Sequence, residues 1–320
     1  MRTRTGATGA MAALAAVALA AVAACSSGSS SSSSPAAGAS SSGNNPLSQG
    51  GSSGSVVVGS ANFPEDELLA VIYAKALEAK GVKVTTKLNI GAREVYYPQI
   101  QKGTISIIPD YNGSLLTGVV DKTSKARTTA QVDAALTAQL PSTLEILNPS
   151  PATDSDSVTV TQATANKYHL KSIADLKAVA GSMVIGGPPE FKTRTDGLIG
   201  LKAYYGLTFK SFDPLDESGP ITLAALKDGK VQAADVFTTT PQIITDKLVP
   251  LADPKFNFAA QNVIPLVYKP AMNATIMNTL NAVSAKLTTS ALLQMDNAVI
   301  VMKADYGTVA EGFLQAEGLT

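Results

Sequence analysis

The chain has one cysteine, Cys25, and one histidine, His169, among its 320 residues. A single cysteine forms no internal disulfide and leaves no Cys–His pair for nucleophilic catalysis. The sequence also lacks a P-loop, a zinc-binding motif and a nucleophile elbow, and His169 lies at a predicted helix end, which is typical of a solvated or capping residue. These absences argue against an enzyme and predict no catalytic residue, cofactor or metal, although a Ser–Lys or two-carboxylate hydrolase remains an open alternative.

Charge of one sign is not in excess, because 25 Lys and Arg residues balance 25 Asp and Glu residues. A formal net charge of zero gives no indication of binding to nucleic acid. No second apolar stretch of membrane length follows Ala24. We therefore expect the folded part to be soluble, and we expect it to act as a monomer.

The N-terminus carries the signals of an exported protein. Arg2 and Arg4 precede an unbroken run of Met, Ala, Leu and Val from Met11 to Ala24, which has the length of a signal-peptide core. The small residues just before Cys25 resemble the bacterial lipoprotein signal. That resemblance implies a signal peptide over residues 1–24, cleavage before Cys25, lipid attachment to its sulfur, and a location on the extracytoplasmic face of the cell membrane. An ordinary signal peptide with an incidental cysteine is the alternative.

A segment of low complexity follows Cys25. Residues 26–55 consist almost entirely of Ser, Gly, Ala, Asn, Pro and Gln, with no charge and one large aliphatic residue, Leu47. Such a composition cannot bury enough apolar surface to offset its ordering entropy. Residues 25–55 are therefore predicted to be a flexible tether, with an average reach of about 30 Å.

From Val56 to Thr320 short apolar runs alternate with segments of helical periodicity. This alternation predicts an α/β fold with mostly parallel sheets, in which ligands bind beyond the carboxyl ends of the strands. The positions just after predicted strands hold Asn62 and Phe63, Asp110 and Tyr111, Glu190 and Phe191, and Thr238. Strands are predicted at Val56–Val58, Val82–Leu88, Ile105–Ile108, Leu144–Leu147, Val158–Val160, Met183–Ile185, Val231–Phe237 and Val263–Tyr268.

Five ordered blocks carry a resemblance to a known family. GSANFPEDELLAVIYAKALEAKG (Gly59–Gly81) and REVYYPQIQKGTISIIPDYNGSLLTG (Arg93–Gly118) resemble the first two blocks of the glycine betaine, choline and proline binding proteins of osmoprotectant ABC transporters. PPEFKTRTDGLIGLKAYYGLTF (Pro188–Phe209), ADVFTTTPQI (Ala234–Ile243) and NVIPLVYK (Asn262–Lys269) are similar to its later blocks. The blocks cover nearly all of residues 56–320, in the family's order.

The resemblance implies a type II periplasmic-binding-protein-like fold, with two α/β lobes that close on a ligand. Its two crossing strands would lie near Ser157–Thr161 and Val263–Lys269. Lobe one would then comprise residues 56–161 and 263–320, and lobe two residues 162–262. The expected partner is an ABC permease in the membrane, to which the protein would deliver a quaternary ammonium osmoprotectant such as glycine betaine or choline.

The same resemblance implies site residues. An aromatic cage would hold the quaternary ammonium by cation–π attraction, and an arginine would bind a carboxylate. Tyr111 matches the cage tyrosine, Arg194 the arginine, and Phe237 a position where tyrosine is common. The expected ligand-binding residues are Asn62, Tyr111, Ser114, Phe191, Arg194, Phe237 and Thr238.

Three positions depart from the family. Ala61 stands where many members have lysine, and Ser157 and Gln261 stand near positions that supply aromatic rings in some members. Either other rings such as Tyr97 or Phe191 substitute, or the receptor binds a different small polar solute. A lipid-anchored hydrolase and a sensory lobe are the alternatives from other classes.

Overall fold

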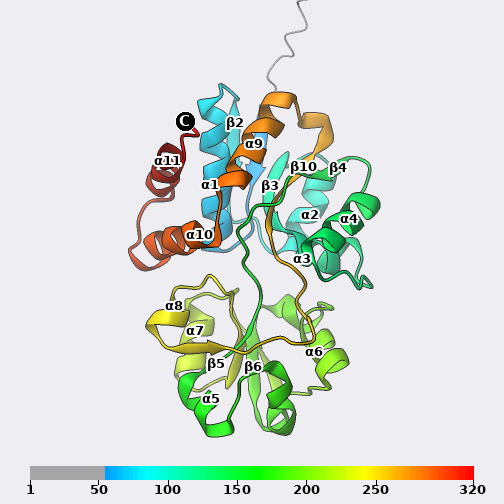
Figure 1. Cartoon of the computed structure of the whole chain (residues 1–320), viewed down its shortest axis with the longest axis vertical. Coiled ribbons are helices and arrows are strands. Elements are labelled where there is room, and N and C mark those ends of the chain that lie inside the picture. The colour runs from blue at the N-terminus through cyan, green and yellow to red at the C-terminus, as the bar shows by residue number, and fades with distance from the viewer. Residues whose placement is uncertain (1–54) are drawn as a thin grey trace, which may run out of the picture. The chain divides into compact units, whose positions relative to one another are not determined.

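A computed structural model describes residues 55–320, so the predicted signal peptide, the lipidated Cys25 and the tether up to residue 54 lie outside the described part. The described chain forms two five-stranded sheets, each in its own lobe (Figure 1). The two-lobed α/β fold predicted from the sequence is thereby confirmed.

The first sheet has the strand order β2–β1–β3–β10–β4. β1 pairs in parallel with β2 and β3, whereas β10 runs antiparallel to β3 and β4. β10 lies between β3 and β4, although it follows both by more than 100 residues in the sequence. The strands are β1 (Val56–Gly59), β2 (Val84–Lys87), β3 (Ile107–Tyr111), β4 (Leu144–Ile146) and β10 (Val263–Tyr268).

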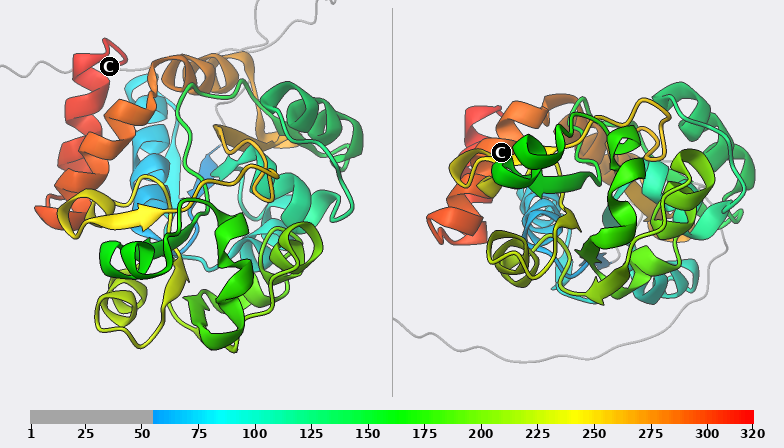
Figure 2. Two further views of the ribbon diagram at one scale, coloured as in Figure 1. Left: turned by 60° about the horizontal axis from the view of Figure 1, so that its bottom comes forward. Right: turned by 90° about the horizontal axis from the view of Figure 1, so that it is seen from below.

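Helices from both ends of the described chain cover this sheet. α1 packs against α9, α10 and α11, so the C-terminal helices belong to the first lobe (Figures 1 and 2). Pro64 begins α1, where a proline suits the first helical turn, and Gly81 follows the end of the helix with a φ of 76°. The helices are α1 (Pro64–Ala79), α2 (Arg93–Gln101), α3 (Asn112–Leu115), η1 (Leu116–Val120), α4 (Thr129–Gln139), η5 (Lys269–Ala271), α9 (Ala274–Lys286), α10 (Thr289–Asp296), η6 (Asn297–Val301) and α11 (Tyr306–Ala316).

The second sheet repeats this topology in the order β7–β6–β8–β5–β9. β6 pairs in parallel with β7 and β8, and β5 is antiparallel to β8 and β9. The strands are β5 (Val158–Thr161), β6 (Val184–Gly187), β7 (Ser211–Pro214), β8 (Ala233–Asp235) and β9 (Leu248–Pro250). The helices are α5 (Gln162–Tyr168), η2 (Ile173–Ala178), η3 (Ala180–Ser182), η4 (Pro189–Lys192), α6 (Leu198–Tyr205), α7 (Pro220–Lys227) and α8 (Gln242–Thr245).

Two segments connect the lobes, residues 147–157 and residues 251–262. They run side by side, because Asp154 N donates to Gln261 O at 3.1 Å and Thr153 forms an antiparallel bridge with Asn262. The predicted crossing strands differ from this arrangement. Val158–Thr161 hydrogen-bonds to β8 and β9 within the second sheet, and Val263–Tyr268 lies within the first, so each crossing precedes the predicted strand.

Each lobe has its own apolar core. One buried cluster fills the first lobe, whereas the second lobe has two smaller clusters, built around Leu176 and Leu226. Within residues 55–320 no helix is both long and apolar enough to span a bilayer. His169 is exposed and ends α5 with a φ of 56°, which matches its predicted position at a helix end.

Candidate ligand-binding site

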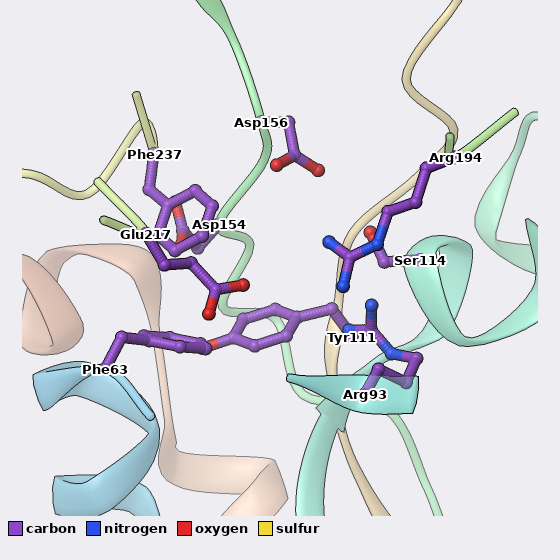
Figure 3. Close-up of a pocket in the computed structure, with 9 residues that line it drawn as sticks. All are labelled: Phe63, Arg93, Tyr111, Ser114, Asp154, Asp156, Arg194, Glu217 and Phe237. Atoms are coloured by element: carbon purple, nitrogen blue, oxygen red, sulfur yellow. The ribbon is translucent and has the colours of Figure 1, made fainter. Parts of the chain in front are cut away.

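A pocket lies where the two lobes meet (Figure 3). The first lobe contributes residues that follow β1, begin α2 and end β3, and the second lobe contributes residues that follow β6, β7 and β8. The crossing segment supplies two aspartates. The lining residues are Phe63, Arg93, Tyr111, Ser114, Asp154, Asp156, Arg194, Glu217 and Phe237.

One end of the pocket is aromatic. The Phe63 ring lies 6.1 Å from the Tyr111 ring and 5.1 Å from the Phe237 ring, measured between centroids. The Tyr111 hydroxyl donates to Glu65, whose other carboxylate oxygen accepts from Thr239 Oγ1 at 2.6 Å. Burial, with the Asp296 carboxyl nearby, raises the pKa of Glu65 well above its usual range. The hydroxyl of Tyr111 is thus bound within the protein, while its ring lines the pocket (Figure 3).

The other end carries two guanidinium groups. Arg93 donates from Nε and Nη2 to Asp110 Oδ1 at 3.0 and 2.8 Å. Arg194 of the second lobe donates from Nε and Nη2 to the two carboxylate oxygens of Glu94 in the first lobe, at 3.1 and 3.0 Å. In residues 55–320, Nη1 of each arginine makes no hydrogen bond, so both can still donate to an anion.

Three carboxylates also line the pocket, from Asp154, Asp156 and Glu217. Asp154 Oδ1 accepts from Thr238 Oγ1 at 3.1 Å and from Thr239 N at 3.0 Å. Oε2 of Glu217 is buried without a hydrogen bond in the described part, and burial raises the pKa of this carboxyl to about 7. No group of three or more His, Cys, Asp or Glu side chains within residues 55–320 is arranged to hold a metal ion.

The structure brings four of the expected ligand-binding residues to this pocket, namely Tyr111, Ser114, Arg194 and Phe237. It places the other three elsewhere. Asn62 is exposed outside the lining, and Phe191 is buried in the core of the second lobe. Thr238 lies behind the pocket, where its hydroxyl donates to Asp154 and accepts from Ser155 N at 2.9 Å.

The departures from the family pattern have structural roles here. Ser157 Oγ donates to Val236 O at 2.6 Å, and Gln261 Nε2 donates to Ser114 Oγ at 2.6 Å, so both tie a crossing segment to a lobe. Ala61 N donates to Asp66 Oδ2, at the start of α1. Tyr97 belongs to the first core, and Phe63 is the third ring of the pocket.

Sequence reasoning missed four lining residues, Arg93, Asp154, Asp156 and Glu217. Glu217 follows β7, a strand that was not predicted, because Ser-Phe-Asp-Pro has little apolar alternation and is partly exposed. With β7 recognised, the rule that ligands bind after strand ends would have indicated Glu217. Asp154 and Asp156 lie in a segment that connects the lobes, and no local sequence pattern predicts such a segment.

Comparison with known proteins agrees with this geometry. The substrate-binding domain of ABC-type glycine betaine transport systems matches residues 54–316. The glycine betaine-binding protein YehZ of Escherichia coli is 28% identical over 278 residues, 83% of this chain and 91% of that protein. A glycine-betaine-binding protein of Pseudomonas aeruginosa is 26% identical over 230 residues, 67% of this chain and 72% of that protein. The crystal structure of a glycine betaine/carnitine/choline ABC transporter has a TM-score of 0.64 at 21% identity, over 82% of this chain and 99% of that chain.

Fold and pocket together define a two-lobed solute-binding protein with the type II periplasmic-binding-protein fold, as predicted. The chain belongs to the family of substrate-binding domains of ABC-type glycine betaine transport systems. It is therefore the substrate-binding protein of an ABC transport system. The matched relatives are solute-binding proteins and not enzymes, which agrees with the absence of catalytic motifs.

Proposed function

We propose that the pocket captures glycine betaine or choline between the closing lobes. The observation that carries this proposal is the polarity of the pocket, with three rings and Glu217 at one end and two guanidinium groups at the other (Figure 3). Ring faces attract a quaternary ammonium, and a guanidinium fork suits a carboxylate. Glycine betaine is a zwitterion and would touch both lobes at once, so its binding favours the closed arrangement.

The expected contributions of the two ends can be compared with the free energy that a micromolar receptor needs. Each cation–π contact contributes about 0.5–2 kcal/mol, so three rings contribute roughly 1.5–6 kcal/mol. A charge-assisted hydrogen bond to the carboxylate adds about 1.5–3 kcal/mol. The two ends together supply roughly 3–9 kcal/mol for glycine betaine, and micromolar affinity, about 8 kcal/mol, lies near the upper end of that range. Phe63 supplies one aromatic ring to the pocket, in place of the rings that some family members have near Ser157 and Gln261.

Titration calorimetry of the purified protein with glycine betaine and choline tests this function. Tyr111→Ala should weaken both ligands by about 2–30-fold, because each loses one ring face. Tyr111→Phe keeps the ring and loses only the bond to Glu65, so it should retain most of the affinity. Binding of neither ligand by the wild type would refute the proposal.

Arg194 requires its own control, because it already pairs with Glu94 across the lobes. Glu94→Gln weakens that pairing alone and should weaken glycine betaine and choline equally. Arg194→Ala should do the same and in addition weaken glycine betaine by about 10–150-fold, since only this ligand has a carboxylate. Equal losses of both ligands in Arg194→Ala would show that Arg194 serves the lobe contact and not the ligand.

A second candidate is a zwitterion whose cationic end carries an N–H group, such as proline. Oε2 of Glu217 would accept a hydrogen bond from such an N–H, whereas with a quaternary ammonium the same carboxylate interacts through its charge alone. A thermal-shift screen against betaines, choline, carnitine, ectoine, proline and sugars separates the candidates. The bound solute should stabilise the fold by about 2.7 kcal/mol at a hundredfold excess over its dissociation constant.

We also propose that Cys25 is lipidated and holds the protein, on its tether, at the extracytoplasmic face near an ABC permease. The support is the charged start, apolar run and small residues that precede this cysteine. Cys25→Ala should release the protein from the membrane fraction or leave an uncleaved precursor. Unchanged processing and membrane retention would remove this proposal.

A further inference from the structure

Glu217 is held in a well-defined loop between β7 and α7. Asp216 Oδ1 accepts from Thr222 N at 2.7 Å and fixes the loop to the start of α7. Ser218, at a φ of 52°, accepts at Oγ from Phe237 N at 2.9 Å. A non-glycine residue in the left-handed region is uncommon and concentrates at functional sites. These contacts fix the Glu217 backbone beside the aromatic end of the pocket.

The Glu217 carboxylate is directed into the pocket toward the rings of Phe63 and Tyr111 (Figure 3). Its Oε2 is buried and accepts no hydrogen bond within residues 55–320. By contrast, Asp154 and Glu65 each accept from two donors at the pocket wall. An unsatisfied buried acceptor costs about 1–3 kcal/mol, and more when it is charged. A ligand that brings a hydrogen-bond donor or a positive charge to Glu217 would offset this cost.

We propose that Glu217 is a specificity-determining residue, the counter-ion that selects ligands with a cationic headgroup at the aromatic end of the pocket. The proposal rests on the proposed function and adds to the three rings a formal negative charge beside them. A positive headgroup gains from both, whereas a neutral headgroup of the same shape gains only apolar contact.

The charged surroundings make this selection depend on pH. Burial raises the pKa of Glu217 to about 7, and the nearby Glu190 and Asp156 add to the rise, while Arg194 and Arg93 oppose it. A bound cation favours the ionised carboxylate, so its binding releases the proton that the empty site holds below about pH 7. The groups that face Glu217 from the surrounding elements are Arg93, Tyr111, Asp154, Asp156, Glu190, Arg194 and Asp235.

The test titrates choline and its neutral isostere 3,3-dimethyl-1-butanol into the wild type and two variants at pH 6, 7 and 8. Glu217→Gln keeps the shape and removes the charge, so it should weaken choline at least tenfold at pH 8 and leave the isostere within twofold. Glu190→Gln is the matched control, because it removes a neighbouring carboxylate outside the lining and should change choline less than threefold. Wild-type affinity for choline should rise between pH 6 and pH 8 by up to about tenfold per unit, and Glu217→Gln should flatten that rise.

Wild type that binds neither choline nor glycine betaine would overturn the proposed function together with this proposal. Wild type that binds choline while Glu217→Gln binds it within twofold would overturn this proposal alone. Titrations in buffers of different ionisation enthalpy count the released protons. Equal proton release by the wild type and Glu217→Gln at pH 7 would also contradict it.

Discussion

The two lobes share one topology but differ in how they treat the aspartate near the end of their middle strand. In the first lobe Asp110, near the end of β3, accepts from Arg93, from Tyr96 Oη at 2.7 Å and from Tyr111 N at 2.7 Å. In the second lobe Asp235 ends β8, and its buried Oδ1 accepts no hydrogen bond within residues 55–320. Burial and the neighbouring Asp156 raise the pKa of Asp235 well above its usual range.

This difference indicates that the two aspartates have different roles. In the first lobe Asp110 is fully hydrogen-bonded and fixes Arg93 and Tyr111 before any ligand arrives. In the second lobe one carboxylate oxygen of Glu217 and one of Asp235 accept no hydrogen bond in the described part of the chain. Such groups cost stability and cluster at functional sites, because a ligand compensates them on binding.

The largest expected effect is on the stability of the first lobe. Asp110→Asn leaves the buried Arg93 guanidinium without its counter-charge and should lower the free energy of unfolding by about 3–5 kcal/mol. Asp235→Asn is the matched variant in the second lobe and should cost less than about 1 kcal/mol, because within residues 55–320 Oδ1 of this carboxyl accepts no hydrogen bond and no arginine depends on its charge as Arg93 depends on that of Asp110. Urea unfolding measures both. Equal losses would show that the two lobes do not differ in this way.

The next effect concerns pH. The pKa of Glu217 is raised to about 7 in the folded protein, so between about pH 4.5 and 7 the folded state keeps a proton that the unfolded state releases. Stability of the unliganded wild type should therefore fall as pH rises through this window, by up to about 1.4 kcal/mol per unit from this group. Glu217→Gln should reduce that slope in urea unfolding. A slope identical to that of the wild type would mean that Glu217 titrates normally.

The smallest effect concerns a single hydrogen bond between the lobes. Thr239 Oγ1 donates to Glu65 Oε2 at 2.6 Å and joins the second lobe to the first. Thr239→Val keeps the shape and removes the donor, so ligand affinity should fall by about 2–10-fold, or roughly 0.5–1.5 kcal/mol. Calorimetry with glycine betaine measures the change. An unchanged affinity would show that this bond does not contribute to closure.

Much of the fold follows from local patterns in the sequence. Apolar runs and apolar alternation predicted eight of the ten strands, all except β7 and β9, because these signals lie in neighbouring residues. The positions of the crossings were not accessible in this way. Whether Val158–Thr161 connects the lobes or joins a sheet depends on its pairing with β8 and β9, which are distant in sequence.

The residues of the pocket could also be predicted only in part from the sequence. Tyr111, Arg194, Ser114 and Phe237 were expected from family blocks, and they lie together in the structure. The pairing of Arg194 with Glu94 was not foreseen, because it joins residues 100 positions apart in the chain. Glu217 was missed with its strand β7, and Phe191 was misjudged because a ring after a strand can equally enter the core.

The most direct test of the account compares glycine betaine with 3,3-dimethylbutanoate, which has the same shape and carboxylate but a carbon in place of the charged nitrogen. The account holds that three rings and Glu217 recognise the positive charge, while Arg194 receives the carboxylate. Titration calorimetry of the wild-type protein should therefore show glycine betaine binding and the isostere at least tenfold weaker. Equal affinities for the two compounds would contradict the account, because the pocket would then recognise shape and carboxylate without sensing the cation.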